Sequence, residues 1–140
     1  MRIFTIGYQH SHPDEIFNKL KDHYVSLLLD VRSFVNGGRP VFRKNSVEHF
    51  APNYGFQYVW AKELGGKPYD RSLYTNGKPD YRKMALSPVF TKGVGYLCQD
   101  LNHGQTIALM CMEANPDECH RKNLITDFLK SKMKINVIHL

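Results

Sequence analysis

The sequence predicts a single α/β domain, residues 1–140, in which helices cover both sides of a mostly parallel sheet of about five strands. Short apolar runs alternate with segments of helical periodicity along almost the whole chain, as in three-layer folds. One predicted strand contains Leu27-Leu28-Leu29 with no polar residue between them, which is typical of a parallel strand buried on both faces. A chain of 140 residues can bury one sizeable core.

The first half of the chain contains three predicted strands and two predicted helices. The first strand ends at Gly7, and a helix with Ser11 as its N-cap begins near Pro13. The second strand closes on Asp30, and the glycine pair at 37–38 marks the loop after it. The predicted elements are strands 3–6, 25–31 and 56–60 and helices 13–24 and 45–54.

The second half begins with the longest irregular stretch, residues 64–79, which is rich in Gly, Pro, Tyr and charge. Long loops in compact domains tend to be functional or mobile. After it, apolar periodicity predicts two helices, and apolar runs predict two strands. The predicted elements are helix 88–101, strand 105–112, helix 116–132 and strand 135–139.

The most informative stretch runs from Thr106 to Arg121 and contains a buried strand, a turn and the start of the last helix. In the turn, Asn115 is a good N-cap and Pro116 suits the first helical position. A helix N-terminus leaves backbone N–H groups free and favours bound anions. The stretch therefore predicts a functional site around one helix N-terminus.

Polar side chains follow several predicted strands at the points where the strands end. Ligands of open parallel sheets bind outside the carboxyl ends of the strands, so we expect these side chains to share one site. The candidate catalytic residues are Glu113, His120, Asp30, Cys119 and Cys111. The candidate ligand-binding residues are Tyr8, His10, Arg32, Arg39, Arg43, Gly65, Gly66 and Arg121. Gly65-Gly66 fits neither the P-loop nor the dinucleotide-binding fingerprint, so no particular cofactor is predicted.

The phase of the last helix separates the three residues at its start. The apolar stripe at positions 124–129 places Arg121 toward the sheet, His120 at the margin and Cys119 largely away from it. Sequence neighbours on a helix do not face each other, so Cys119 and His120 are expected to form a poor catalytic pair.

Arg121 needs a partner, because an unpaired buried charge is very costly. Asp30 and Glu113 are the candidates for a permanent structural pair. The other interpretation is a bound phosphate or carboxylate held by the guanidinium fork.

Three cysteines are an odd number at irregular spacing, so no disulfide framework is expected. A cysteine near a helix start, such as Cys119, has the setting of a reactive thiol. A zinc site from Cys111, Cys119 and His120, with His10 or His12, is an alternative. No pair of these residues has Cys-x-x-Cys or His-x-x-x-His spacing, so no metal site is predicted.

The charge of the chain is concentrated in its middle. The formal net charge is +6, and residues 32–83 carry ten Lys or Arg against four Asp or Glu, while the remainder is neutral. The same segment holds ten of the 17 aromatic residues. A basic, aromatic-rich segment indicates an anionic partner such as a nucleotide or a nucleic acid. The alternative is a solvated basic surface with aromatic residues in the core.

No apolar run approaches the ~20 residues that a membrane span needs. The N-terminal apolar run is too short, and is interrupted too early by Gly7, to act as a signal peptide. These observations predict a cytoplasmic protein with no membrane partner.

Five motifs resemble the "domain of unknown function 488" family in order and spacing, over essentially the whole chain. They are Thr5-Ile6-Gly7-Tyr8, Asp30-Val31-Arg32, Leu64-Gly65-Gly66, Cys111-Met112-Glu113, and Pro116 with Cys119-His120-Arg121. The resemblance implies a small bacterial or archaeal cytoplasmic α/β domain, and it supplies candidate positions without a reaction. One departure is Phe34-Val35-Asn36-Gly37-Gly38, where the family usually has a proline and a serine.

Three hypotheses about function follow from these patterns, and the sequence does not decide whether the protein is an enzyme. The leading hypothesis is an enzyme or enzyme-like domain that acts on a phosphate-bearing substrate, with Glu113 or Asp30 as acid or base and Arg32 and Arg121 as anion ligands. The first alternative is a non-catalytic nucleic-acid-binding module that uses residues 32–83. The second is a thiol-dependent sulfur-transfer or redox domain.

Overall fold

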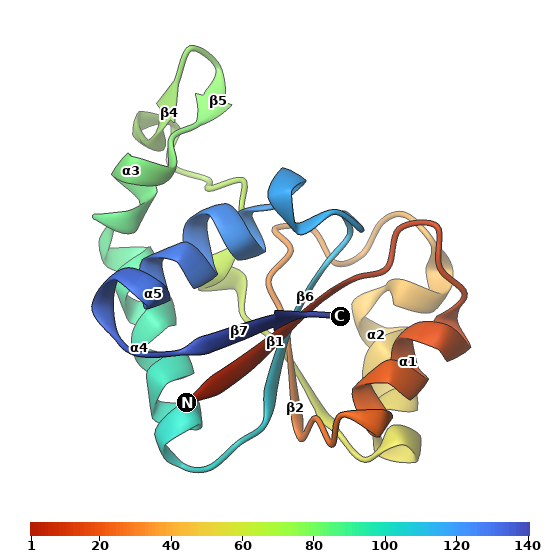
Figure 1. Ribbon diagram of the computed structural model, residues 1–140. Coiled ribbons are helices and arrows are strands. Elements are labelled where there is room, and N and C mark those ends of the chain that lie inside the picture. The colour runs from red at the N-terminus through yellow and green to blue at the C-terminus, as the bar shows by residue number, and fades with distance from the viewer.

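The five predicted strands form one parallel sheet. A computed structural model describes all residues, 1–140 (Figure 1). The strands are β1 (Arg2–Gly7), β2 (Leu27–Asp30), β3 (Gln57–Trp60), β6 (Ile107–Cys111) and β7 (Asn136–His139). Their spatial order is β3-β2-β6-β1-β7, and every neighbouring pair is parallel. The predicted fold is confirmed, and the motif that follows β6 lies at the middle of the sheet.

Helices cover both faces of this sheet (Figure 1). On one face pack α1 (Pro13–Asp22) and α2 (Lys44–Phe50), and on the other pack α4 (Pro88–Asn102) and α5 (Asp127–Lys132). Side chains alternate between the faces along each strand. Leu28 and Met110 therefore belong to the core under α1 and α2, whereas Leu29 and Cys111 belong to the core under α4 and α5.

α1 and α4 begin with side-chain caps, but the cap of α1 is not the predicted residue, and α2 begins without a side-chain cap. His12 caps α1 in place of Ser11, because its Nδ1 accepts a hydrogen bond from the Asp14 N–H at 3.2 Å. Ser87 caps α4 by accepting from the Phe90 N–H at 3.2 Å. Gly104 follows α4 with a φ of 84°, a backbone conformation that favours glycine.

The last helix differs from the continuous helix predicted over 116–132. Asn115 accepts from the Asp117 N–H at 3.0 Å, but it caps only a 3-10 turn, Pro116–Glu118. Cys119 then has an extended backbone, and the helix restarts after it as a π-helical turn, Arg121–Thr126, that leads into α5. The break has a physical reason, because neighbours about 100° apart on one regular helix cannot all face the core. The extended residue lets Cys119, His120 and Arg121 all be buried.

The irregular stretch after Leu64 folds into small elements that the sequence analysis did not predict. A hairpin turns at Asn76 and Gly77, which both have positive φ values, as the tightest hairpin turns require. Figure 1 shows this hairpin projecting from the body of the domain beyond α3. The elements here are the 3-10 turns Lys62–Leu64 and Arg71–Leu73, β4 (Tyr74–Thr75), β5 (Lys78–Pro79) and α3 (Tyr81–Ala85).

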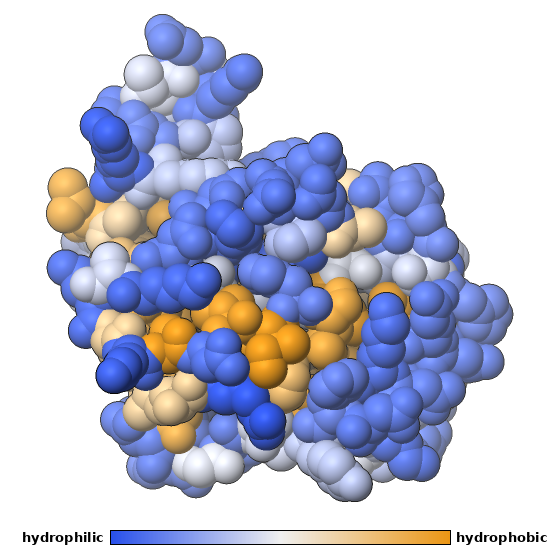
Figure 2. Space-filling model, viewed as in Figure 1, coloured by the Kyte–Doolittle hydropathy of each residue, from blue (hydrophilic) through white to orange (hydrophobic).

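One edge of the sheet leaves apolar side chains partly uncovered. Figure 2 shows an apolar band across the face on which β7 and the C-terminus lie. β7 pairs only with β1, and Val137 and Ile138 within it are half-buried. None of the helices has the length and apolar character needed to cross a bilayer.

The end of β1 depends on a glycine. A Cβ atom added at Gly7 would lie 1.8 Å from the Glu113 carbonyl oxygen, which belongs to the backbone and cannot rotate away.

We expect Gly7→Ala to lower the free energy of unfolding by about 3 kcal/mol or more, because the turn after β6 has to move. Urea unfolding followed by circular dichroism measures this loss. Gly95→Ala is the matched control, because Gly95 lies in the exposed middle of α4 with open space around it. It should stabilise the protein by about 1 kcal/mol. A Gly7→Ala protein as stable as the parent would contradict the close contact.

Candidate functional site

The predicted site residues gather at the carboxyl ends of β2 and β6, but in two clusters on opposite faces of the sheet. Cys111, Glu113, Cys119 and His120 form one cluster, which we call the thiol cluster, on the α4–α5 side. Asp30, Arg32 and Tyr8 form the second cluster on the α1–α2 side. Val31 joins the two, because its carbonyl oxygen accepts a hydrogen bond from His120.

His120 is the centre of the thiol cluster and is only 6% exposed. Its Nε2 lies 2.7 Å from the Val31 carbonyl oxygen and 3.0 Å from the Leu64 carbonyl oxygen. Carbonyl oxygens only accept, so Nε2 must carry the hydrogen. The other nitrogen, Nδ1, faces two sulfur atoms, at 3.9 Å from Cys111 Sγ and 3.8 Å from Cys119 Sγ.

The glycine pair packs directly against this imidazole. A Cβ atom added at Gly66 would lie 2.6 Å from His120 Nδ1, and one added at Gly65 would lie 2.6 Å from Ser33 Oγ. The Lys67 N–H donates to the same Ser33 hydroxyl at 2.8 Å. Gly65 and Gly66 therefore serve close packing between the loop after β2 and His120.

The two thiols of the cluster have different surroundings. Cys119 Sγ accepts a hydrogen bond from the Arg121 N–H at 3.5 Å, and Cys111 Sγ lies 3.1 Å from Glu113 Oε2. Hydrogen bonding from Cys111, followed by the effects of His120 and the Arg121 N–H, lowers the pKa of the Cys119 thiol below its ordinary value, against the opposing effect of burial. Hydrogen bonding with Cys119 and burial raise the pKa of the Cys111 thiol, and the Glu113 carboxylate raises it further. Cys119 is therefore the thiol that ionises first.

The expectation that Cys119 and His120 face apart is wrong. Cys119 lies outside the helix with an extended backbone, so the 100° helical step does not apply to it. All three cysteines are free, and Cys98 lies in α4 away from the other two.

Asp30 and Arg32 form a closed network on the other face. Asp30 is fully buried and accepts from Arg32 Nε at 2.8 Å and Arg32 Nη2 at 2.6 Å. Arg32 also donates to the Tyr8 hydroxyl at 2.9 Å and to the Phe42 carbonyl oxygen at 2.7 Å. The Tyr58 hydroxyl donates to the remaining side of the Asp30 carboxylate. The hydrogen-bonding groups of Asp30 and Arg32 are therefore engaged by partners within this network.

Arg121 is fully buried, as predicted, but its partners differ from those expected. It donates from Nη1 to the Glu113 carbonyl oxygen at 2.6 Å, from Nη2 to the Ala114 carbonyl oxygen at 3.3 Å and from Nε to Thr5 Oγ1 at 3.2 Å. The Glu113 carboxylate points to Cys111 instead, and Asp30 is engaged by Arg32, so neither carboxylate pairs with Arg121. The guanidinium holds the turn after β6 against β1 and has no exposed surface.

Three other candidates lie in exposed loops on the α1–α2 side. Arg39 donates to the Ser11 carbonyl oxygen at 2.8 Å, and Arg43 donates to the Gly38 carbonyl oxygen at 3.1 Å. His10 is exposed with a φ of 64°. These residues are separate from the thiol cluster.

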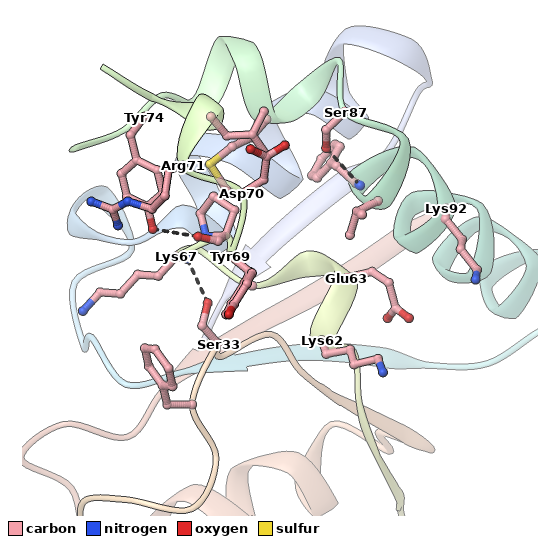
Figure 3. Close-up of a pocket in the computed structure, with 17 residues that line it drawn as sticks. Ser33, Lys62, Glu63, Lys67, Tyr69, Asp70, Arg71, Tyr74, Ser87 and Lys92 are labelled. Carbon is pink, nitrogen blue, oxygen red and sulfur yellow. Dashed lines mark hydrogen bonds between the residues drawn. The ribbon is translucent and has the colours of Figure 1, made fainter. Parts of the chain in front are cut away.

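The basic segment lines a large hollow, which we call the basic groove and which has a volume of about 1110 Å³ (Figure 3). Lys67 and Arg71 lie toward one end of it, and Lys62 and Lys92 lie toward the other, with Tyr69 between them (Figure 3). The remaining lining residues are Ser33, Phe34, Glu63, Gly65, Pro68, Asp70, Leu73, Tyr74, Met84, Ser87, Val89 and Phe90. The composition of residues 32–83 predicted the basic and aromatic character of this groove, but not that α4 would supply its far wall.

Several groups at the thiol cluster were not predicted. Val31 and Leu64 act through backbone carbonyl oxygens, which every residue carries, so no sequence signal marks them. Tyr81 of α3 is half-buried near the cluster. Burial, followed by the negative charges of Cys119 and Glu113, raises the pKa of its phenol.

The sequence matches the family model described as "Domain of unknown function DUF488" over residues 12–129. The chain belongs to the DUF488 family. Comparisons with curated proteins and with solved structures gave no significant match. The matched range of this DUF488 domain runs from the cap of α1 into α5, so it includes the thiol cluster and the basic groove.

Tyr58 gives the Asp30 network a measurable pH dependence. Burial, followed by the negative charge of Asp30 and the hydrogen bond to it, raises the pKa of the Tyr58 phenol. A pKa raised in the folded state adds stability that is present below the unfolded value of about 10 and is lost as the pH rises above it.

We expect Tyr58→Phe to lower the free energy of unfolding by about 1–2 kcal/mol at pH 8, and this loss should shrink as the pH rises above about 10. Urea unfolding at a series of pH values measures it. Tyr69→Phe, at an exposed position, is the control and should change stability little at any pH. A pH-independent cost at Tyr58 would contradict the assignment.

Proposed function

We propose that this DUF488 domain binds a segment of single-stranded nucleic acid in the basic groove. The observation that carries the proposal is the lining of the groove, where four cationic side chains and two exposed aromatic rings, Phe34 and Tyr69, surround one hollow at the edge of the sheet.

Charge favours a phosphate-bearing ligand. Lys62, Lys67, Arg71 and Lys92 line the groove, against the acidic residues Glu63 and Asp70. Neither acid forms a salt bridge with these cations, so the cationic side chains are free to contact phosphates. A groove that carries net positive charge raises the local concentration of polyanions and speeds their association.

The aromatic rings favour unpaired bases. Phe34 is 72% exposed although it is a large apolar side chain, and Tyr69 is fully exposed. The Arg71 guanidinium lies over the Tyr74 ring, with its central carbon 4.3 Å from the ring centroid. Stacking of bases on such rings, next to cations that follow the backbone, is how sequence-tolerant single-strand binding works.

The volume of the basic groove favours a ligand of more than one nucleotide. Pockets for drug-sized ligands have volumes of about 300–1,000 Å³. The basic groove, at about 1110 Å³, is larger and open to solvent, so it has room for a short strand.

We expect a fluorescent single-stranded oligonucleotide to bind with an affinity that falls as salt rises. The slope of log K against log [salt] should be about −0.7 for each phosphate neutralised, so the double variant Lys67→Ala/Arg71→Ala should lower its magnitude by about 1.4. Tyr69→Ala should cost about 1–3 kcal/mol of binding free energy through lost stacking. Fluorescence anisotropy measures both.

Lys21→Ala is the matched control, because Lys21 is an exposed cation on α1, on the other side of the sheet. It should leave both the affinity and the salt slope almost unchanged. A mononucleotide and a DNA duplex are the comparison ligands, and tighter binding of either would contradict the choice of a single strand. Absent or salt-independent binding would contradict the proposal itself.

A second candidate function is catalysis on the ligand held in the groove. The observation that favours it is the wall that the groove shares with the thiol cluster, since Gly65 lines the groove while Gly66 touches the His120 ring. Glu113 and His120 would then act as the acid and base. Glu113→Gln should leave oligonucleotide affinity unchanged and abolish turnover of a labelled oligonucleotide, which gel electrophoresis detects. Unchanged turnover in this variant would contradict the role of Glu113, and absence of turnover in the parent protein would leave the domain a binding module.

A further inference from the structure

We propose that Cys111, Cys119 and His120 bind a zinc ion. Each offers one ligand atom, and the three atoms lie within 4.8 Å of one another in a buried position. This site stands or falls separately from ligand binding in the basic groove.

The distances between the ligand atoms fit tetrahedral coordination. With Zn–S bonds of about 2.3 Å and a Zn–N bond of about 2.0–2.1 Å, the S···N edge of a tetrahedron is about 3.6 Å. His120 Nδ1 lies 3.9 Å from Cys111 Sγ and 3.8 Å from Cys119 Sγ. Both S···N distances are therefore within a few tenths of an ångström of the tetrahedral value, and all three ligand atoms lie within 4.8 Å of one another.

The imidazole is already held in the state that a metal needs. A metal-bound histidine usually donates its other ring N–H to a carboxylate or a backbone carbonyl, which fixes the tautomer and the ring orientation. His120 Nε2 donates to two backbone carbonyl oxygens, of Val31 and Leu64. Nδ1, the nitrogen left to bind a metal, therefore points toward the two sulfurs, and no hydrogen bond from a nitrogen or oxygen atom occupies it.

Charge also favours zinc at this buried position. Two thiolates offset the charge of Zn²⁺ in a region where an unpaired charge is costly, and the ion would replace the proton between Cys111 Sγ and Glu113 Oε2, which lie 3.1 Å apart. Thiolate and imidazole together are ligands that suit zinc. Three protein ligands leave one position of the tetrahedron for water or a substrate.

The irregular spacing in the sequence does not argue against the site. Cys111 ends β6, whereas Cys119 is the extended residue that interrupts the helix start, and His120 follows it directly. Adjacent residues on a regular helix diverge by about 100°. The break in the helix brings both onto one side, so the ligand set arises from the fold rather than from a Cys-x-x-Cys motif.

Cobalt(II) substitution tests the site directly. We expect the reduced, chelator-treated protein to bind one equivalent of Co²⁺ with thiolate-to-cobalt charge-transfer absorption in the near ultraviolet and strong visible bands of tetrahedral coordination. Zn²⁺ should displace the Co²⁺ stoichiometrically and should raise the thermal unfolding temperature. Cys119→Ser should lower the Zn²⁺ affinity by at least about 100-fold, because losing a ligand costs more than the 10- to 100-fold effect of an outer-shell change.

Two further variants separate coordination from mere stability. Cys98→Ser is the matched control, since Cys98 lies in α4 outside the cluster, and it should leave the cobalt spectrum unchanged. Gly66→Ala keeps all three ligands but places a Cβ 2.6 Å from Nδ1, so it should weaken Zn²⁺ binding by about 10- to 100-fold.

A measurement on the unsubstituted protein avoids the risk that a variant misfolds. One equivalent of Zn²⁺ should slow alkylation of Cys111 and Cys119, followed by mass spectrometry, and leave the rate at Cys98 unchanged. Cobalt bound without charge-transfer absorption, or equal protection of all three cysteines, would overturn the proposal. So would a protein that binds no metal while Cys119 is alkylated selectively, and that result would favour thiol chemistry instead.

Discussion

One buried N–H group, on Nε2 of His120, connects the segments that meet at the carboxyl-end edge of the sheet. It is shared by the carbonyl oxygens of Val31 and Leu64, at 2.7 and 3.0 Å, and so ties the end of β2 and the turn before the glycine pair to the start of the last helix. Removing the donor would leave two buried carbonyl groups unpaired, at about 1–3 kcal/mol each. The same bond decides the chemistry of the site, because it fixes which ring nitrogen faces the two sulfurs.

Arg121 performs a different task one residue further along. Its guanidinium is 0% exposed and contacts only neutral oxygens, of Thr5, Glu113 and Ala114. A buried charge without a carboxylate partner is costly to the domain. Arg121 nevertheless holds the turn after β6 in place, and that turn positions the Glu113 carboxylate beside Cys111. Arg121 is thus a positioning residue, and the anion site predicted at its side chain is not accessible from solvent.

The sequence predicted the architecture of the domain well and the local geometry of the site less well. Unbroken apolar runs such as Leu27-Leu28-Leu29 identify buried parallel strands, because both faces of such a strand are covered. The predicted side chains of β2 and β6 lie at the carboxyl ends of these strands, but they do not form the one shared site that was expected, because alternation along the strands places Asp30 and Cys111 on opposite faces. The pairing of Cys119 with His120 was not predictable from periodicity, because it depends on a single extended residue. Backbone acceptors such as Val31 leave no trace in the sequence at all.

The glycine pair explains why the thiol cluster and the basic groove lie so close together. Gly65 faces Ser33 and the basic groove, whereas Gly66 faces the His120 ring, so a wall without side chains separates a solvent-filled hollow from a buried imidazole. Leu64, the residue before the pair, is held by the same His120 through its carbonyl oxygen. The His120 ring, which faces the two thiols, thus also contacts the segment that leads directly into Lys67, Tyr69 and Arg71 of the groove.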